Sequence, residues 1–333
     1  MPQNLRSDDP RLTWPGAVSL QKTAAWVMPW RLPFDHLELY PPVALQERAA
    51  MPAGVRLAFR SDTTLLAGEI EPPKEAAKLD LCCDGKLHAS VEIAGQSSFR
   101  FDELPSGDKR IELWLPQYGE FRLRSLELSD GASVEKATLA SPRWITYGSS
   151  ITQCRAAASP TQTWPAIVAR GSGLNLTCLG FGGQCHLDAM VARLIRDLPA
   201  DFISICAGIN IYGAGSLSPR SFKPALIGTV KIIRETHQHT PLVLMSPIFS
   251  PPRETTKNSV GFTLQAMRDE VAASVDALRG YGDEHIHYVN GLDIFGPEHA
   301  HLLPDQLHPN AEGYRVMGEN FLSHVIPRVF PRS

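Results

Sequence analysis

The sequence predicts an antiparallel β-sandwich followed by a parallel, doubly wound α/β sheet. From about Arg31 to Leu128, apolar residues recur with period two and turn residues interrupt them at short intervals, as in half-buried antiparallel strands. After Gly131, apolar strands alternate with amphipathic helical stretches, as in parallel sheets. The 333 residues are enough for two domains, each with its own core. We expect an N-terminal domain over 1–138, with an irregular N-terminal extension, and a second domain over 139–333.

In the first domain, three segments carry the clearest strand pattern. Apolar residues recur at every second position over residues 55–60, 111–115 and 121–124. Asp84-Gly85 stands between two further runs and predicts a hairpin turn. Many short strands with such turns predict a sandwich of antiparallel sheets.

In the second domain, apolar runs predict parallel strands at residues 143–147, 174–179, 202–206, 242–245 and 287–289. Helical spacing appears between and after these runs at Leu264, Met267, Val271, Val275 and Leu278, and again at Tyr314, Met317, Phe321 and Val325. In such sheets the chemistry lies in loops at the carboxyl ends of the strands.

The composition excludes several classes of protein. A hydrophobic share of 43% and a charged share of 20% are ordinary for a globular chain. The net charge of -3, without long runs of one sign, provides no basic surface for nucleic acid or a membrane. The apolar stretch from Ile203 to Gly215 is too short to span a bilayer, and the N-terminus lacks a secretory pattern. We therefore expect a cytoplasmic protein that binds neither nucleic acid nor a membrane.

The six cysteines form no C-x-x-C pair. A chain of this length does not need disulfides for stability, so we interpret the cysteines as buried or site-lining thiols.

The first candidate for chemistry is Gly148-Ser149-Ser150, directly after the first predicted parallel strand. A serine on a tight turn from strand to helix has its hydroxyl and a backbone N–H at the mouth of the sheet. The alternative is a serine that only caps the helix, because serine is a favoured N-cap.

The second candidate is Asp305-Gln306-Leu307-His308-Pro309, before the last helix. A carboxylate three residues ahead of a histidine can bind Nδ1 and leave Nε2 to act as a base. Pro309 suits the first turn of the helix. A surface loop is the alternative for this motif, and His299 or His301 is an alternative base.

Two further loops follow successive strands. Gly180-Phe181-Gly182-Gly183 follows one strand and Gly208-Ile209-Asn210 follows the next. A glycine N–H and an asparagine amide can both stabilise an oxyanion, although each segment alone is more typical of an ordinary turn.

These four blocks, in this order, resemble the SGNH subgroup of the GDSL esterases and lipases over roughly residues 142–328. The resemblance implies a three-layer α/β/α, flavodoxin-like fold with a parallel sheet, here preceded by a jelly-roll-like β-sandwich. It implies Ser150 as nucleophile, His308 as general base and Asp305 as the carboxylate that orients the base. It also implies an oxyanion hole made by the N–H of Ser150 together with Gly183 and Asn210.

The sequence departs from the family pattern at four positions, which are Ser149, Ile151, Cys178 and Ile211. They replace, in order, the acid and the leucine of the G-D-S-L block, the block-two asparagine and the acid after the block-three asparagine. None removes a proton-transfer group or an oxyanion donor. The chain is more similar to two-domain members with a β-sandwich before the catalytic domain. Those include sugar-ester hydrolases and an acyltransferase from a tetracycline-type antibiotic pathway.

Several residues lie near the motifs and are candidates for substrate binding. His186 follows the Gly183 loop, Tyr212 follows Asn210, and Cys154 lies one turn after Ser150. Ordinary packing explains Cys154 equally well and is the preferred interpretation of Tyr212. Cys185 is a possible nucleophile, but no separate histidine supports it.

The sequence implies neither a metal nor a cofactor. The pairs His237/His239, His285/His287 and His299/His301 lack further ligands to complete a zinc site. The chain has no G-x-S-x-G, H-E-x-x-H or G-x-x-x-x-G-K motif and no dinucleotide-binding spacing.

The motifs predict a serine esterase that acts on short-chain O-acyl esters of a small or carbohydrate-like alcohol. An O-acyltransferase would use the same residues, with an alcohol in place of water. The third hypothesis is a carbohydrate-binding protein with a degenerate catalytic domain.

Overall fold

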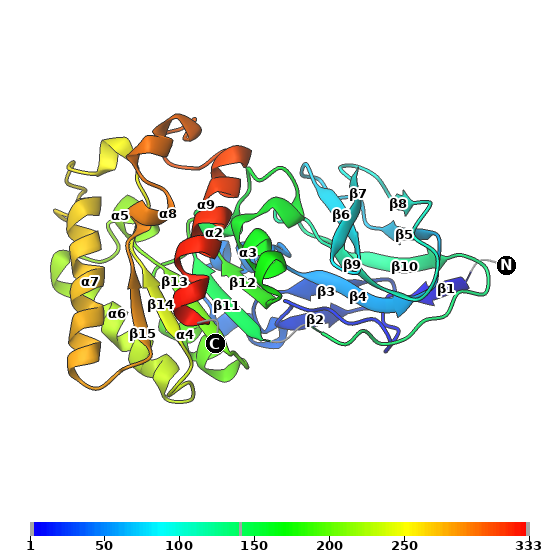
Figure 1. The fold of residues 1–333 in the computed structure, drawn as a ribbon, viewed down its shortest axis with the longest axis horizontal. Helices are drawn as coiled ribbons and strands as arrows, with labels where there is room; N and C mark the ends of the chain where they lie inside the picture. The colour runs from blue at the N-terminus through cyan, green and yellow to red at the C-terminus, as the bar shows by residue number, and fades with distance from the viewer. Residues whose placement is uncertain (1–2, 140–141, 331–333) are drawn as a thin grey trace.

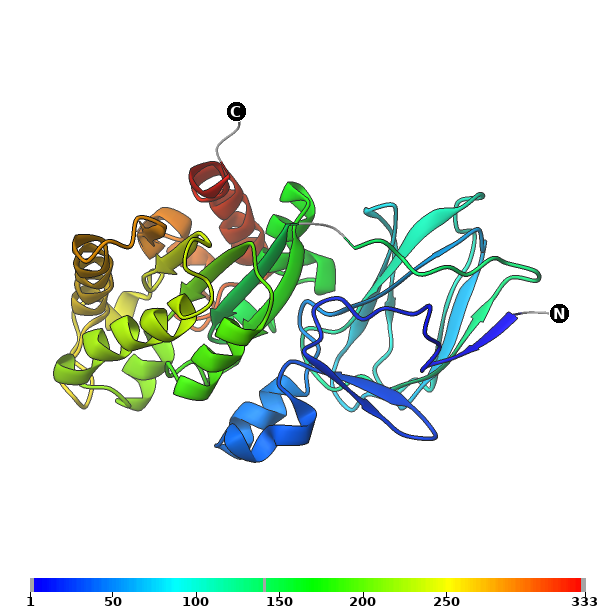
Figure 2. The ribbon, with the colours of Figure 1, turned by 90° about the horizontal axis from the view of Figure 1, so that it is seen from below.

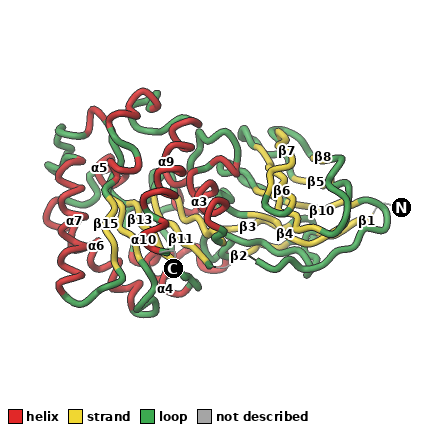
Figure 3. Tube along the Cα trace, viewed as in Figure 1, coloured by secondary structure: helices red, strands yellow, loops and turns green. Residues whose placement is uncertain are grey.

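A computed structural model describes residues 3–139 and 142–330. The chain forms two lobes, an N-terminal lobe of strands and a C-terminal lobe of strands and helices (Figures 1 and 2). Figure 3 shows that helices concentrate in the C-terminal lobe. No helix in the described ranges is long and apolar enough to cross a bilayer.

The N-terminal lobe is a sandwich of antiparallel sheets, as the alternating pattern predicts. In its described residues, one sheet has the order β2-β3-β10-β5-β8 with β1 beside β10, and the other has the order β4-β9-β6-β7. The strands are β1 (Gln3–Arg6), β2 (Ser19–Lys22), β3 (Val27–Trp30), β4 (Arg56–Ser61), β5 (Leu66–Ile70), β6 (Lys78–Cys83), β7 (Lys86–Glu92), β8 (Ser98–Phe101), β9 (Lys109–Trp114) and β10 (Leu123–Leu128). Buried residues such as Phe59, Leu113 and Phe121 form the core of this lobe.

Two sequence-based expectations for this lobe are wrong. The N-terminal extension is not irregular, because β1, β2 and β3 pair into the sheet. Between Arg31 and β4 the chain forms helices η1 (Phe34–Leu39) and α1 (Val43–Ala49) rather than strands. The Asp84-Gly85 hairpin is confirmed, since it joins β6 and β7. The boundary after residue 138 lies between β10 and the first parallel strand and stays a prediction.

The C-terminal lobe contains a parallel sheet of five strands in the order β12-β11-β13-β14-β15. Its strands are β11 (Arg143–Gly148), β12 (Asn175–Gly180), β13 (Phe202–Cys206), β14 (Leu242–Met245) and β15 (Ile286–Val289). The bounds agree with the predicted strands to within one residue at each end, which confirms the doubly wound sheet.

Helices cover both faces of this sheet, which confirms the three-layer arrangement. They are α2 (Ser150–Gln153), η2 (Pro160–Gln162), α3 (Trp164–Ser172), α4 (Ala189–Asp197), α5 (Ile209–Ala214), α6 (Pro219–Arg234), η3 (Pro251–Arg253), α7 (Leu264–Gly280), α8 (Gly291–Ile294), η4 (Pro297–Leu302), α9 (Ala311–His324) and α10 (Ile326–Val329). One core packs the sheet against α4, α6 and α7, and the other packs it against α3 and α9.

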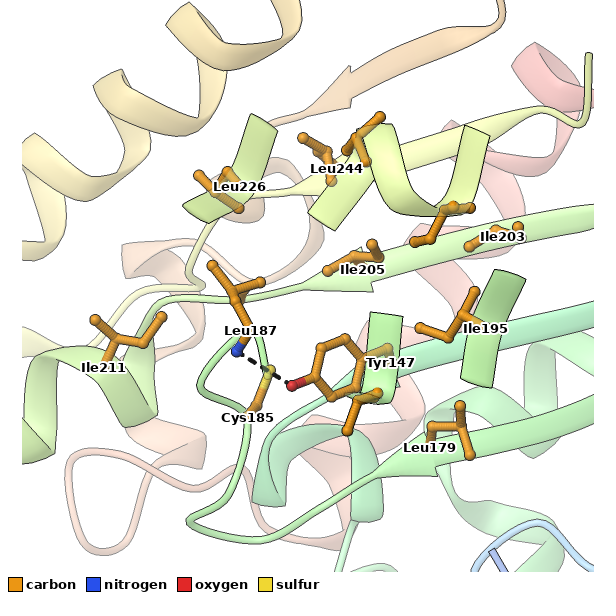
Figure 4. Close-up of a cluster of buried hydrophobic side chains, with 14 of the residues drawn as sticks. Tyr147, Leu179, Cys185, Leu187, Ile195, Ile203, Ile205, Ile211, Leu226 and Leu244 are labelled. Atoms are coloured by element: carbon orange, nitrogen blue, oxygen red, sulfur yellow. Dashed lines mark hydrogen bonds between the residues drawn. The ribbon is translucent and has the colours of Figure 1, made fainter. Parts of the chain in front are cut away.

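Successive strand residues enter opposite cores because side chains alternate across a sheet. Trp144 belongs to the core with α9, whereas Tyr147 belongs to the core with α4 and α6. In Figure 4 the ring of Tyr147 lies among aliphatic side chains, including Ile195 of α4 and Leu226 of α6. Its hydroxyl accepts a hydrogen bond from the Leu187 N–H at 3.3 Å. Tyr147 therefore stabilises the loop that follows Gly183.

Buried polar contacts join the two lobes. Arg31 donates hydrogen bonds to the carbonyls of Cys178 at 3.0 Å and Gly180 at 2.6 Å on the edge strand β12. Arg56 of β4 donates to the Leu176 carbonyl on the same strand at 3.0 Å. Burial lowers the pKa of both arginines to about 10, so both are charged at neutral pH. The N-terminal lobe thus holds the strand that leads into the Gly182-Gly183 loop.

A buried carboxylate also connects the two lobes. Asp80 of β6 accepts hydrogen bonds from the Ser159 hydroxyl at 2.6 Å, the Thr161 N–H at 2.8 Å and the Thr161 hydroxyl at 2.6 Å. Its other oxygen accepts from the Ser90 hydroxyl at 2.6 Å. Because these donors satisfy the carboxylate without water, the contact fixes η2 against the sandwich.

Candidate active site

Ser150 is the first residue of α2, at the carboxyl end of β11. The preceding residue, Ser149, is the N-cap, and its hydroxyl accepts a hydrogen bond from the Ile151 N–H at 3.2 Å. The capping role therefore belongs to Ser149, which leaves the Ser150 hydroxyl for the cleft. A Cβ at Gly148 would lie 2.1 Å from the Thr152 hydroxyl oxygen. Only glycine allows this close turn from strand to helix.

The structure brings Ser150, His308 and Asp305 together. The Ser150 Oγ lies 2.9 Å from His308 Nε2, and His308 Nδ1 lies 2.6 Å from Asp305 Oδ2. The side chains of His308 and Asp305 are 37% and 54% exposed. The predicted approach of the carboxylate to Nδ1 is thus present, and the surface-loop alternative does not account for the contact with Ser150.

Asp305 also organises the backbone that carries His308. Its Oδ1 accepts hydrogen bonds from the Leu307 N–H at 3.0 Å and the His308 N–H at 2.7 Å. Partial burial raises the pKa of Asp305, but the hydrogen bonds from the His308 side chain and these two N–H groups outweigh it. The net result is a pKa of about 2. Asp305 is therefore a carboxylate at neutral pH and fixes the ring with Nδ1–H as the donor.

The last helix starts later than the sequence indicates. Asn310 is the N-cap of α9 and accepts a hydrogen bond from the Gly313 N–H at 2.9 Å. Pro309 therefore precedes the cap instead of occupying the first helical turn. The loop before it is held by Ser250, whose hydroxyl donates to the Gln306 carbonyl at 2.7 Å.

Gly183 and Asn210 line the same cleft as Ser150. Asn210 Oδ1 accepts a hydrogen bond from the Cys185 N–H at 3.0 Å, so its amide N–H groups remain for the cleft. Gly183 has a φ of 74° and no atom within 4 Å of where a Cβ would lie. The loop is anchored by Gln153, whose Oε1 accepts the Gly182 N–H at 2.8 Å.

The cleft has a volume of about 1100 Å³ and is lined by both lobes. Arg48 of α1 and Tyr118, between β9 and β10, reach it from the N-terminal lobe, and Gln153, Arg155 and Arg253 come from the C-terminal lobe. Sequence analysis missed these residues. Only Gln153 carried a signal, since it follows Ser150 by three residues on one helical turn. Tertiary packing alone brings the other four residues, Arg48, Tyr118, Arg155 and Arg253, to the cleft.

The three residues that sequence analysis offered as candidates for substrate binding lie outside the cleft lining. Cys154 is fully buried and its thiol contacts the Ile151 carbonyl at 3.1 Å, so it does not face substrate. Tyr212 is 9% exposed, and its hydroxyl donates to the Thr256 carbonyl at 2.9 Å. His186 contacts the Gly183 carbonyl through Nε2 at 3.0 Å. His186 therefore supports the glycine loop from outside.

No cysteine thiol and no other histidine contacts the Ser150 hydroxyl in the described residues. All six cysteines are free thiols, as expected. Burial raises the pKa of Cys185 far above its ordinary value, which does not suit a nucleophile. His299 lies beside Glu298 at 3.4 Å, and His308 is the histidine bound to Ser150. In the described part of the chain, no group of three His, Cys, Asp or Glu side chains could hold a metal ion.

Each lobe matches the model of a known protein family. Residues 146–316 match the GDSL-like Lipase/Acylhydrolase family model, and residues 12–124 match the model of the SsfX3 N-terminal domain. The chain belongs to the GDSL-like lipase/acylhydrolase family. It is thus an ester-acting enzyme of the SGNH fold with an N-terminal SsfX3-type domain. A search of curated proteins found no match.

Solved structures include full-length relatives. The salicylyl-acyltransferase SsfX3 from a tetracycline biosynthetic pathway is 39% identical with a TM-score of 0.92, over 99% of this chain and 98% of that one. A candidate GDSL-like lipase from Bacteroides ovatus is 20% identical with a TM-score of 0.80, over 99% and 98%. A family two carbohydrate esterase from Cellvibrio japonicus is 14% identical with a TM-score of 0.68, over 99% and 98%. The last two likenesses show the fold alone.

Proposed function

We propose that this protein is an O-acyltransferase that moves an acyl group from an ester or thioester donor to a hydroxyl acceptor through an acyl-enzyme on Ser150. The observation that carries the proposal is the hydrogen-bonded series Ser150, His308 and Asp305 at the edge of a cleft shared by both lobes. A serine hydrogen-bonded to an oriented imidazole is the arrangement that nucleophilic acyl transfer requires.

In the first half-reaction, His308 Nε2 takes the proton of Ser150 while Oγ forms a bond to the donor carbonyl carbon. The bond to the leaving group then breaks, and His308 returns the proton to the departing oxygen or sulfur. In the second half-reaction, the acceptor hydroxyl gives its proton to Nε2 and attacks the acyl-enzyme. Ser150 leaves and recovers that proton, so the enzyme returns to its starting state.

The oxyanion of each tetrahedral intermediate would be held by the N–H of Ser150, the N–H of Gly183 and the amide of Asn210. Two features support these assignments. All three residues line one cleft, and the Asn210 amide oxygen is occupied by the Cys185 N–H, which leaves donors free. Preorganised donors of this kind act on charge that develops only in the transition state.

Transfer is favoured over hydrolysis by two observations. The relative with 39% identity over nearly the full chain is a salicylyl-acyltransferase. The cleft of about 1100 Å³ exceeds the upper size of most small-ligand pockets, about 1,000 Å³, so it suits a donor and an acceptor together. Hydrolysis of short-chain or carbohydrate esters is the second candidate. The observation that favours it is the 37% exposure of the His308 side chain, which admits water to the acyl-enzyme.

The test is a partition experiment with the full chain. Donors are p-nitrophenyl esters and acyl-coenzyme A thioesters of several chain lengths, and acceptors are a panel of phenols, polycyclic alcohols and sugars. The acylated acceptor and the free acid are quantified as acceptor concentration rises. A transferase forms more acylated acceptor than free acid at saturation. If every acyl group goes to water at all acceptor concentrations, the protein is an esterase.

A further inference from the structure

Three side chains form a cluster on the cleft wall that the triad does not use: Arg48, Tyr118 and Arg155. The guanidinium carbon of Arg155 lies 4.2 Å from the centre of the Tyr118 ring, and that of Arg48 lies 5.5 Å from it. Arg48 Nη1 lies 3.4 Å from the Tyr118 hydroxyl. Two positive groups from different lobes therefore converge on one ring beside the catalytic serine's cleft.

The two arginines differ from most arginines of this chain. Many arginines elsewhere in the described residues are paired with carboxylates, as in Arg100 with Asp102 and Arg143 with Asp201. Within residues 3–139 and 142–330, neither Arg48 nor Arg155 forms an ion pair or a hydrogen bond with a carboxylate. Asp305, the carboxylate that also lines the cleft, is bound to His308.

The Gly182-Gly183 loop fixes the position of Arg48. Its Nε donates to the Gly182 carbonyl at 3.3 Å, which keeps the guanidinium next to the Gly183 loop and leaves its terminal nitrogens free of carboxylate. Cation–π contact with one ring stabilises each arginine only weakly at an exposed site. The same contact brings like charges close together. A bound anion would offset this repulsion and use the planar donors of both guanidinium groups.

We propose that Arg48 and Arg155, supported by the Tyr118 ring, form a subsite for an anionic group, a carboxylate or a phosphate, on the substrate that reacts at Ser150. The inference rests on the proposed function, because it assigns part of the same cleft. It narrows the substrate class to acyl donors or acceptors that carry such a group some distance from the reacting carbon. Both lobes supply the subsite, so the N-terminal lobe contributes directly to substrate selection.

The test measures binding to full-length Ser150→Ala protein, in which turnover does not interfere. The probes are 4-acetoxybenzoate, 4-acetoxyphenyl phosphate and neutral 4-acetoxybenzamide, which share one frame and differ in the para group. The variants are Arg155→Gln, Arg155→Lys and Arg48→Gln, and Arg100→Gln is the matched control on β8. Arg155 is exposed, so its substitution does not disturb a core, and thermal unfolding checks the fold of Arg48→Gln.

We expect an anionic probe to bind more tightly than the neutral one. Each arginine-to-glutamine change should weaken binding of the anion about 10-fold or more, as expected for a charge-assisted hydrogen bond. Arg155→Lys should retain part of the preference, Arg100→Gln should retain all of it, and 0.5 M salt should reduce it in every protein with both arginines. The probe that loses affinity identifies carboxylate, phosphate or both as the ligand.

The subsite is refuted if Arg155→Gln and folded Arg48→Gln bind the anionic and neutral probes with the same ratio of affinities as the Ser150→Ala protein that has both arginines. It is equally refuted if neither anion binds more tightly than the amide to the protein with both arginines. Failure of the proposed function has a different signature, which is ester turnover by Ser150→Ala at the rate seen with Ser150 present. The binding measurement does not depend on that outcome.

Discussion

Arg31 provides the sharpest test of how the N-terminal lobe supports the site. Its side chain has 0% exposure and donates hydrogen bonds to the carbonyls of Met51, Cys178, Gly180 and Arg48. Its guanidinium also lies 4.9 Å from the centre of the Phe181 ring. The perturbation is Arg31→Met. Methionine retains the volume of the aliphatic part of arginine but has no hydrogen-bond donor in its side chain.

The expected loss of stability follows from these contacts. A net contribution of about 1 kcal/mol per hydrogen bond, over four carbonyls, gives about 4 kcal/mol. A buried carbonyl left without a donor costs about 1–3 kcal/mol, so incomplete rearrangement around Met would give a loss of the same size. Arg31→Met should therefore lower the free energy of unfolding by about 3–5 kcal/mol. It should also lower acyl transfer, because strand β12 leads directly into the Gly182-Gly183 loop.

The assay is urea unfolding followed by tryptophan fluorescence, with hydrogen exchange of peptides that cover residues 176–186. Arg31→Lys should show an intermediate loss, since one ammonium cannot reach all four carbonyls. The control Arg100→Met removes an exposed arginine on β8 and should change stability by less than about 0.5 kcal/mol. Unfolding of Arg31→Met at the wild-type midpoint, with unchanged exchange in the loop, would contradict this role of Arg31.

Three further predictions concern the site and its supporting loop. Asn210→Ala should lower kcat by about 10²- to 10³-fold with a small change in KM, as loss of an oxyanion donor does; an unchanged kcat would remove Asn210 from the hole. Asp305→Asn should lower kcat by about 10³- to 10⁴-fold. Because the folded-state pKa of Asp305 is about 2 against an ordinary 3.8, its contribution to stability is complete above about pH 5 and lost as pH falls towards 2. The difference in unfolding midpoint between wild type and Asp305→Asn should be constant from pH 5 to 8 and shrink below pH 4. Tyr147→Phe should cost about 1–3 kcal/mol because it leaves the Leu187 N–H without its acceptor, and a calorimetric melt identical to wild type would contradict this.

The parallel sheet could be predicted closely because its strands are buried on both faces. The run Leu242–Met245, for example, is continuously apolar, fully buried and followed by Ser246, so its length and composition both indicate a buried strand. The N-terminal strands could not be predicted in the same way. β2 has no buried residue and β1 has one, Leu5. Without a buried face, an edge strand carries no alternating signal.

Some residues of the site could be predicted from the sequence and others could not. Ser150, His308 and Asp305 belong to short local motifs whose spacing already indicates their chemistry. Arg48 and Tyr118 lie 70 residues apart in the chain and meet within the N-terminal lobe. Arg155 contacts the Tyr118 ring only because the two lobes pack together. No local pattern marks a surface arginine as part of a cleft, so tertiary structure was needed to find the cluster.

The proposed acyl transfer passes through a covalent intermediate on Ser150. Rapid mixing with an activated ester, acid quenching and mass spectrometry of the proteolysed chain measure this directly. We predict an acyl group on the peptide that contains Ser150, formed within the first turnover, removed faster as acceptor is added, and absent from Ser150→Ala. An acyl group on any other side chain, or first-turnover product without an adduct, would contradict the account.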